Sequence, residues 1–241
     1  MDTKFEDIVS EIKKTVDLFP DNIAIIEDGI PTLSYSQMWE DATCIANRLK
    51  EQCDSSEYVT VELPKSSRYI CAILGCWMAG KAFVPIGKDL PDSRKRYIEE
   101  TVDTNLSITE YNYDDFFKSH PIDSVETLTA STPAYVIFSS GTTGKPKGIL
   151  VGHSGLVNLA RCQRKAFRLT KHSRSLFFLS INFDASISDI LVTLTSGGAL
   201  VVETTDSVEL SANLLSIIKK RGVTYADIPP SVLRVTNSND C

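Results

Sequence analysis

The stretch that decides how this chain folds is Tyr-Val-Ile-Phe-Ser-Ser-Gly-Thr-Thr-Gly-Lys-Pro-Lys-Gly, residues 135–148. An apolar run passes into hydroxyl-bearing residues and glycines, followed by two lysines. This order predicts a strand that opens into a loop. Glycine lets the backbone turn and approach a ligand closely, and hydroxyl and ammonium groups suit a polyphosphate. By composition alone, an ordinary solvated loop is also consistent with these residues.

Strand-like and helical patterns alternate on both sides of this loop. The predicted strands are residues 22–27, 58–63, 82–86, 134–139, 176–180, 199–202 and 223–228. The predicted helices cover residues 5–16, 34–49, 67–79, 154–167, 186–195 and 208–220, and Pro91 marks a further helix start. Strands separated by helices indicate an α/β fold with layered, mostly parallel sheets and flanking helices.

The pattern is weakest over residues 101–133, where Asn, Asp, Ser and Thr are dense. We therefore predict a first α/β subdomain portion over residues 1–130. A second portion, with the loop described above, is predicted over residues 131–241.

Composition limits the classes of partner and compartment. The chain has 25 Lys and Arg against 31 Asp and Glu, a formal charge of −6, which argues against sequence-independent binding to nucleic acid. No apolar run reaches the ~20 residues of a membrane span. The six cysteines form no C-x-x-C pair and the N-terminus has no signal-peptide pattern. Together these features favour a reduced, cytoplasmic setting without a membrane partner.

A second glycine-rich stretch has the spacing of a phosphate-binding loop but not its chemistry. Residues 75–81 fit G-x-x-x-x-G-K, yet Ala82 follows where a Ser or Thr would bind the metal ion. The interior of this stretch is apolar and continues a predicted helix. We interpret it as a helix end.

Residues 139–148 resemble the signature loop of the adenylate-forming (ANL) superfamily, T/S-S/T-G-T/S-T-G-x-P-K-G, at every position. The superfamily includes acyl-CoA synthetases, luciferases and the adenylation domains of nonribosomal peptide synthetases. The resemblance implies that the loop closes over the β- and γ-phosphates of ATP. The residues it assigns to phosphate binding are Ser139, Ser140, Gly141, Thr142, Thr143, Gly144 and Lys147.

Three further stretches resemble the peptide-synthetase branch: residues 78–85, residues 153–158 (H-x-x-L-x-N) and residues 183–190, Phe-Asp-Ala-Ser-Ile-Ser-Asp-Ile. The last is similar to F-D-A-S-V-W-E-I, whose Asp binds the α-ammonium group of the amino acid. The resemblance therefore implies substrate binding by Phe183, Asp184 and Ser188. Ser188 replaces a bulky Trp that lines the side-chain pocket in the family, which implies more room or a polar contact there.

The residues alone leave other interpretations open. Asp184 precedes an apolar helix, so capping of that helix is an alternative to ammonium binding. We interpret Asp189 as a solvated helix carboxylate rather than a second anchor. For His153 we expect a positional role near the loop or an ordinary surface placement.

The parent reaction implied by the resemblance converts an amino acid and ATP, with Mg²⁺, into an aminoacyl-adenylate and pyrophosphate. A phosphopantetheine carrier protein or other synthetase domains would then be partners, with an amino acid as substrate. The chain lacks the N-x-Y-G-P-T-E and T-G-D segments and the C-terminal catalytic lysine, so we expect only the N-terminal part of such an enzyme. Two alternatives stay open: a fragment of an acyl- or aryl-acid CoA ligase, and an inactive fragment that serves as a binding or regulatory module.

Overall fold

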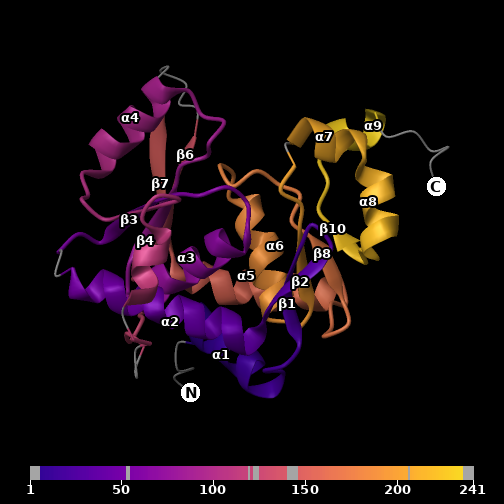
Figure 1. Ribbon diagram of the computed structural model, residues 1–241, viewed down its shortest axis with the longest axis horizontal. Coiled ribbons are helices and arrows are strands. Elements are labelled where there is room, and N and C mark those ends of the chain that lie inside the picture. Colours follow the sequence, from indigo (N-terminus) through magenta and orange to yellow (C-terminus); the bar gives the residue numbers. More distant parts are fainter. Residues whose placement is uncertain are drawn as a thin grey trace.

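The computed structural model describes residues 6–52, 55–118, 120–121, 125–139, 146–205 and 207–235. Within them, ten strands form two five-stranded sheets (Figure 1). The first sheet has the order β10-β8-β9-β1-β2 and the second the order β5-β3-β4-β6-β7. Only the pairs β1–β2 and β6–β7 are antiparallel; the other pairs are parallel. The predicted α/β fold with mostly parallel sheets is confirmed.

The first sheet takes strands from both ends of the chain. Its members are β1 (Ile23–Glu27), β2 (Ile30–Ser34), β8 (Arg174–Leu176), β9 (Ala199–Val202) and β10 (Tyr225–Ala226). The second sheet consists of β3 (Tyr58–Glu62), β4 (Ala82–Pro85), β5 (Ser107–Thr109), β6 (Pro133–Ser139) and β7 (Lys147–Gly152).

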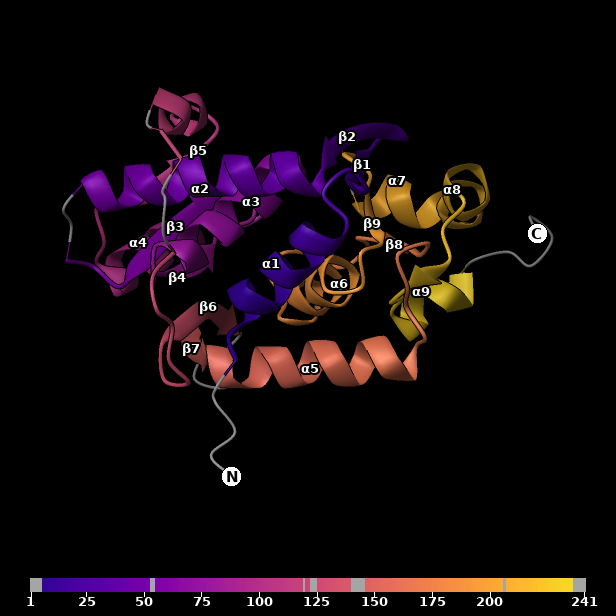
Figure 2. The ribbon, with the colours of Figure 1, turned by 90° about the horizontal axis from the view of Figure 1, so that it is seen from below.

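The helices fill the space between the sheets and cover their outer faces. They are α1 (Ile8–Leu18), α2 (Tyr35–Glu51), α3 (Ser67–Met78), α4 (Asp92–Val102), α5 (His153–Ala166), α6 (Ala185–Leu194), α7 (Ser207–Ala212), α8 (Leu214–Arg221) and α9 (Pro230–Val235), with a 3₁₀ turn at Tyr113–Lys118. In Figures 1 and 2, α1, α2, α3, α5 and α6 lie between the sheets, whereas α4 and α7 to α9 lie outside them.

The layers follow from the alternation of side chains along each strand. In β9, Leu200 and Val202 pack into the large central core, while Val201 packs into the outer cluster with α7 and α8. In β4, Phe83 faces the centre and Val84 faces α4. Successive side chains of a strand point to opposite faces, and parallel sheets are covered on both faces. These strands are therefore apolar throughout.

The start and end of the central helices are set by local signals. Ser34 and Gln37 form a capping box at the start of α2. Gly80, with φ of +71°, ends the α3 segment, so the stretch resembling a phosphate loop is a helix end, as predicted. A positive φ is accessible to glycine without the penalty that a Cβ imposes.

The structure differs from the predicted elements in several places. The strand predicted over residues 176–180 lies earlier, at Arg174–Leu176, and the strand predicted over residues 223–228 is only Tyr225–Ala226. The helix predicted over residues 208–220 is divided at Asn213 into α7 and α8. Sequence reasoning missed β7, which follows the loop directly.

Each sheet takes strands from both sides of residue 130. β6 and β7 pair with the earlier strands β3 to β5, and β1 and β2 pair with the later strands β8 to β10. A division at residue 130 therefore does not separate the two sheets, and a division into subdomain portions stays a prediction. Among the described residues, no helix combines the length and the apolar character that a membrane crossing requires.

Candidate functional site

The signature loop connects two paired strands. Ser139 is the last residue of β6 and Lys147 is the first of β7, and their Cα atoms are partners in the antiparallel ladder. Ser139 is half-buried and Lys147 is exposed. The other predicted phosphate-binding residues, Ser140, Gly141, Thr142, Thr143 and Gly144, lie outside the described residues. The hairpin therefore holds one hydroxyl and one ammonium group at the two ends of the loop.

Asp184 lies at the N-cap position of α6, but its side chain makes no capping hydrogen bond. Asp184 therefore occupies the N-cap position, but its side chain does not cap α6, and the capping alternative is wrong on this point. The carboxylate is exposed, and the start of α6 favours negative charge. Phe183, beside it, is 63% exposed. Asp184 is near enough to the second sheet to act on Tyr135 of β6, because burial and then the charge of Asp184 raise the pKa of that phenol to about 12.

Asn182 fixes the chain just before Asp184. Its Oδ1 accepts a hydrogen bond from the amide of Gly87 at 3.1 Å, and its Nδ2 donates to Oδ1 of Asp89 at 3.2 Å. A Cβ on Gly87 would lie 2.4 Å from Nδ2 of Asn182, so a larger residue here would displace that side chain. The residues after β4 thereby hold the segment that leads into α6.

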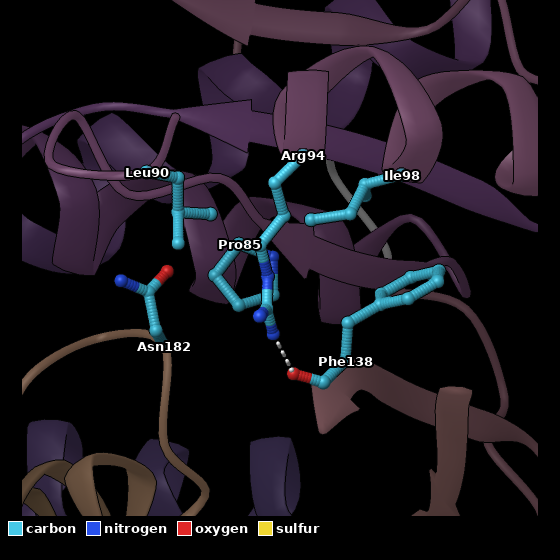
Figure 3. Close-up of a pocket in the computed structure, with 6 residues that line it drawn as sticks. All are labelled: Pro85, Leu90, Arg94, Ile98, Phe138 and Asn182. Atoms are coloured by element: carbon cyan, nitrogen blue, oxygen red, sulfur yellow. Dashed lines mark hydrogen bonds between the residues drawn. The ribbon is translucent and has the colours of Figure 1, made fainter. Parts of the chain in front are cut away.

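The same asparagine lines a small hollow at the end of β6 (Figure 3). Arg94 of α4 reaches across it, and its Nη2 donates to the carbonyl oxygen of Phe138 at 3.0 Å. The hollow measures about 10 Å³, about the space of one water molecule. The β6–β7 hairpin and the segment before Asp184 thus meet at one place, next to the carboxyl ends of β4 and β6.

Ser188 is buried and its hydroxyl bonds to the amide oxygen of Gln163 in α5. Ser188 therefore contacts the helix interface between α5 and α6. No described contact places it in a substrate pocket, so the pocket role stays a prediction.

Asp189 is fully buried, so its interpretation as a solvated carboxylate is wrong. Neither of its oxygens has a hydrogen-bond partner of ordinary geometry among the described residues, although the main chain at Leu179 lies close enough to lower the pKa of Asp189. Burial raises its pKa to about 8, the charge of Asp227 adds to this effect, and Lys65 opposes it. The carboxyl group is therefore largely protonated at neutral pH.

Lys65 lies between the two sheets at the carboxyl end of β8. Its ammonium group donates to the carbonyl oxygens of Phe178, at 2.6 Å, and Phe177, at 3.3 Å. Burial lowers its pKa to about 8, against the charges of Asp189 and Asp89. The lysine thus satisfies main-chain groups where the chain leaves the first sheet.

His153 is fully buried at the start of α5, so surface placement is wrong. Its ring lies edge-on to Trp77, with centroids 5.8 Å apart, and neither ring nitrogen has a described partner. Burial lowers its pKa to about 4. A neutral ring packed on Trp77 is a structural element of the core.

Sequence reasoning missed two residues of the site, Asn182 and Lys65. Asn182 directly precedes the Phe-Asp segment, so its position along the chain was the only local signal for it. Lys65 follows the carboxyl end of β3, the edge of a parallel sheet where ligands dock. Its partners are about 110 residues away in sequence, which no local pattern reveals.

The described residues do not fit a metal ion. No group of three or more His, Cys, Asp or Glu side chains within them is placed to hold one. We therefore assign no residue of this chain to Mg²⁺.

Comparison with known proteins identifies the family. A family model described as AMP-binding enzyme matches residues 12–239. The chain is 30% identical to bacitracin synthase 3 of Bacillus licheniformis over 240 residues, which is 91% of this chain and 4% of that protein. It is 29% identical to tyrocidine synthase 1 of Brevibacillus parabrevis, covering 92% of this chain and 22% of that protein.

Solved structures show the same fold. The N-terminal subdomain of Klebsiella oxytoca NpsA aligns with a TM-score of 0.84 at 20% identity, covering 96% of this chain and 61% of that one. The nonribosomal peptide synthetase FmoA3 aligns with a TM-score of 0.86 at 23% identity, covering 98% of this chain and 27% of that one. The chain therefore belongs to the family of AMP-binding enzymes and is homologous to the N-terminal part of nonribosomal-peptide-synthetase adenylation domains.

Proposed function

We propose that this chain is the part of an amino-acid-activating adenylation domain that holds the ATP phosphates and the substrate ammonium group. The parent reaction joins an amino acid to ATP and releases pyrophosphate. The observation that carries the proposal is the exposed carboxylate of Asp184. It lies at a helix start without a capping bond, near enough to Tyr135 of β6 for its charge to add to the effect of burial in raising the pKa of that phenol.

The two ends of the site have different tasks. The hydroxyl of Ser139 and the ammonium group of Lys147 flank the loop and would bind phosphate oxygens. Asp184 would pair with the α-ammonium group, which orients the substrate carboxylate toward the α-phosphate. Catalysis by such a site consists mainly of positioning and charge stabilisation. Mg²⁺, when bound, would neutralise phosphate charge.

The network behind Asp184 supports this division of tasks. Asn182 is tied to Gly87 and Asp89, and Arg94 is tied to the end of β6. These contacts join the substrate segment and the hairpin to the same loop and helix after β4. A fixed relation between a phosphate site and an ammonium site is what near-attack geometry requires.

The alternatives predict different ligands. An acyl- or aryl-acid ligase needs no partner for an ammonium group, so Asp184 would be dispensable for substrate binding. A binding or regulatory module would need neither Asp184 nor Lys147 for its function. NpsA structures are described with anthranilyl and hydroxybenzoyl AMSN ligands, so an N-terminal subdomain of this fold binds acyl-adenylate mimics without its C-terminal part.

The experiment measures binding of adenylate mimics to this chain by calorimetry. Each aminoacyl sulfamoyl-adenosine of a panel is compared with its analogue that lacks the α-amino group. We expect the best aminoacyl mimic to bind at least tenfold more tightly than its des-amino analogue. Asp184→Asn should remove most of that difference, because it removes the negative charge that would pair with the ammonium group.

Asp114→Asn is the matched control, since Asp114 lies in the 3₁₀ turn at Tyr113–Lys118 and its side chain is 81% exposed. It should leave both affinities unchanged. Equal affinity of the unmutated chain for amino and des-amino mimics would favour the acyl- or aryl-acid ligase. Absence of binding by every mimic would favour the module without adenylation activity.

A further inference from the structure

The charges of this chain are strongly segregated along the sequence. Residues 127–183 contain eight of the 25 Lys and Arg residues and not one Asp or Glu, so all 31 acidic residues lie elsewhere. The remainder of the chain is therefore strongly acidic, and the segment that includes α5 and the approach to β8 is strongly basic. Figure 2 shows α5 running along one side of the molecule toward β8.

The basic residues at the start of β8 and just before it have no acidic partners in the described structure. Elsewhere many cations are paired, as in Lys95 with Glu62 and Arg221 with Glu203. By contrast, no described salt bridge involves Lys171, His172 or Arg174, and all three are exposed. Surface charges that find no internal partner are available to an external one.

These three side chains line one hollow of about 390 Å³. It lies at the amino-terminal ends of β1, β8 and β9, whereas the candidate site lies at the carboxyl ends of the parallel strands. The hollow is therefore separate from the site described above. Its remaining lining is largely apolar and comes from the β1–β2 hairpin and the start of β9: Ile23, Ile26, Pro31 and Ala199.

Lys171, His172 and Arg174 form the rim of the hollow. Two of them contact other parts of the fold, which hold them in place. The ammonium group of Lys171 lies 5.3 Å from the ring centroid of Phe19. Arg174 donates from Nη1 to the carbonyl oxygen of Arg221 at 2.9 Å. That contact joins it to the last turn of α8, where Lys219 and Lys220 are also exposed. The basic surface thus continues from the hollow onto α8.

An unpaired strand edge adjoins the hollow. β2 is the edge strand of the first sheet, and its first three residues are exposed, including Ile30 at 69%. A strand edge offers main-chain groups to an extended peptide. This surface combines a basic rim, an apolar floor and a free strand edge. The combination suits a polypeptide better than a nucleic acid, because a nucleic acid has no aliphatic side chains to cover the apolar floor.

We propose that this surface, formed by Lys171, His172, Arg174 and the floor at β1 and β2, docks an acidic polypeptide segment with interspersed apolar residues. The acidic side chains would pair with the rim and the apolar ones would cover the floor. The proposal is independent of the adenylation function, because it involves the opposite edge of the sheet.

The test uses the full chain and a fluorescein-labelled octapeptide of alternating Glu and Leu, followed by anisotropy at low ionic strength. We expect saturable binding that weakens as salt rises. Lys171→Glu/Arg174→Glu should weaken it about tenfold or more, because like charges then face each other. The control Lys13→Glu/Lys118→Glu makes the same change in net charge on other surfaces and should bind as the unmutated chain does.

Because Arg174 also contacts α8, a second variant guards against a folding defect. Lys171→Glu/His172→Glu leaves Arg174 in place, and it should lose affinity while its circular dichroism is unchanged. Tighter binding of an oligothymidine of equal length than of the peptide would overturn the proposal in favour of nucleic acid. Equal binding by the control and the rim variants, or absence of peptide binding, would also overturn it.

Discussion

Lys147 and Ser139 face each other across the last residue pair of the β6–β7 ladder. Their side chains therefore have a fixed relation to the loop between them, whatever that loop binds. Lys145 lies outside the described residues, and Pro146 separates it from the ladder. The two lysines are thus distinguished by their position along the chain, because Lys147 is a ladder residue of β7.

We predict that Lys147→Ala weakens ATP binding by ~1.5–3 kcal/mol, the range for a hydrogen bond to a charged group. The measurement is calorimetric titration of ATP into a protein completed with the remaining segments of an adenylation domain. Lys145→Ala is the matched control and should have the smaller effect. An equal or larger loss from Lys145→Ala would show that the ladder position does not select the phosphate ligand.

Asp189 and Lys65 make stability depend on pH with opposite signs. The pKa of Asp189 is raised from 3.8 to about 8 in the folded chain, so between these values the unfolded chain holds fewer protons and stability falls as pH rises. The pKa of Lys65 is lowered from 10.5 to about 8, so between 8 and 10.5 the unfolded chain holds more protons. The contribution of Lys65 to the free energy of unfolding therefore rises with pH in this range.

We therefore predict that Asp189→Asn removes most of the decline in unfolding free energy between about pH 4 and pH 8. Relative to the unmutated chain, the variant should gain stability as pH rises through this window, by an amount on the order of kilocalories per mole. Urea denaturation at several pH values measures it. Asp114→Asn, at a side chain that is 81% exposed, is the control and should show no such trend. A constant difference between Asp189→Asn and the unmutated chain would mean that Asp189 is ionised in the fold.

Among the structural elements, the helix α2 begins with a reciprocal capping box. Oγ of Ser34 accepts from the amide of Gln37 at 3.2 Å, and Oε1 of Gln37 accepts from the amide of Ser34 at 2.9 Å. Two amides at the helix start are thereby satisfied. The helix α2 packs closely on α3 and contributes Met38, Ile45 and Leu49 to the central core. Loss of the cap at its start should therefore lower the stability of this core.

Ser34→Ala should lower the free energy of unfolding by about 1 kcal/mol, the usual cost of losing such a cap. Chemical denaturation followed by circular dichroism measures this change. Ser216→Ala, on the exposed part of α8, is the control and should be neutral or slightly stabilising, since alanine is the better helix former. If both variants behave alike, the capping box contributes nothing measurable.

The whole molecule is two sheets held by central helices, with the candidate site at one edge of the sheets and the basic hollow at the other. The chain spans 61% of the NpsA subdomain it matches and far less of the curated synthetases. Its described residues form no metal-binding cluster. The hollow between the β6–β7 hairpin and the segment before Asp184 has space for about one water molecule.

We predict that residues 1–241 alone bind ATP weakly and show no amino-acid-dependent pyrophosphate exchange. Removal of one electrostatic donor from a developing charge costs ~10² to 10³-fold in rate. Within the described residues, the predicted phosphate site contributes the hydroxyl of Ser139 and the ammonium group of Lys147. The assay is radiolabelled pyrophosphate exchange across a panel of amino acids, with a completed adenylation domain as the positive control. Robust exchange by the purified chain would show that these few residues suffice.

The sequence by itself determined the α/β class, the order of most elements and the strand that leads into the glycine-rich loop. It could do so because these features depend on local patterns: apolar strands buried on both faces, helices with defined ends, and a glycine-rich run after a strand. The ladder partners Ser139 and Lys147 agree with the loop limits that the signature predicted.

Only the tertiary structure decided the surroundings of Ser188, Asp189 and His153. Nearly every side chain of α6 is buried, so its sequence has no polar face to indicate which carboxylate meets water. Likewise the apolar run at Phe177 and Phe178 predicted a longer strand, but there the chain leaves the sheet and Lys65 takes its carbonyl groups. Burial and partner choice depend on residues that are far apart in sequence, and only the packed fold brings them together.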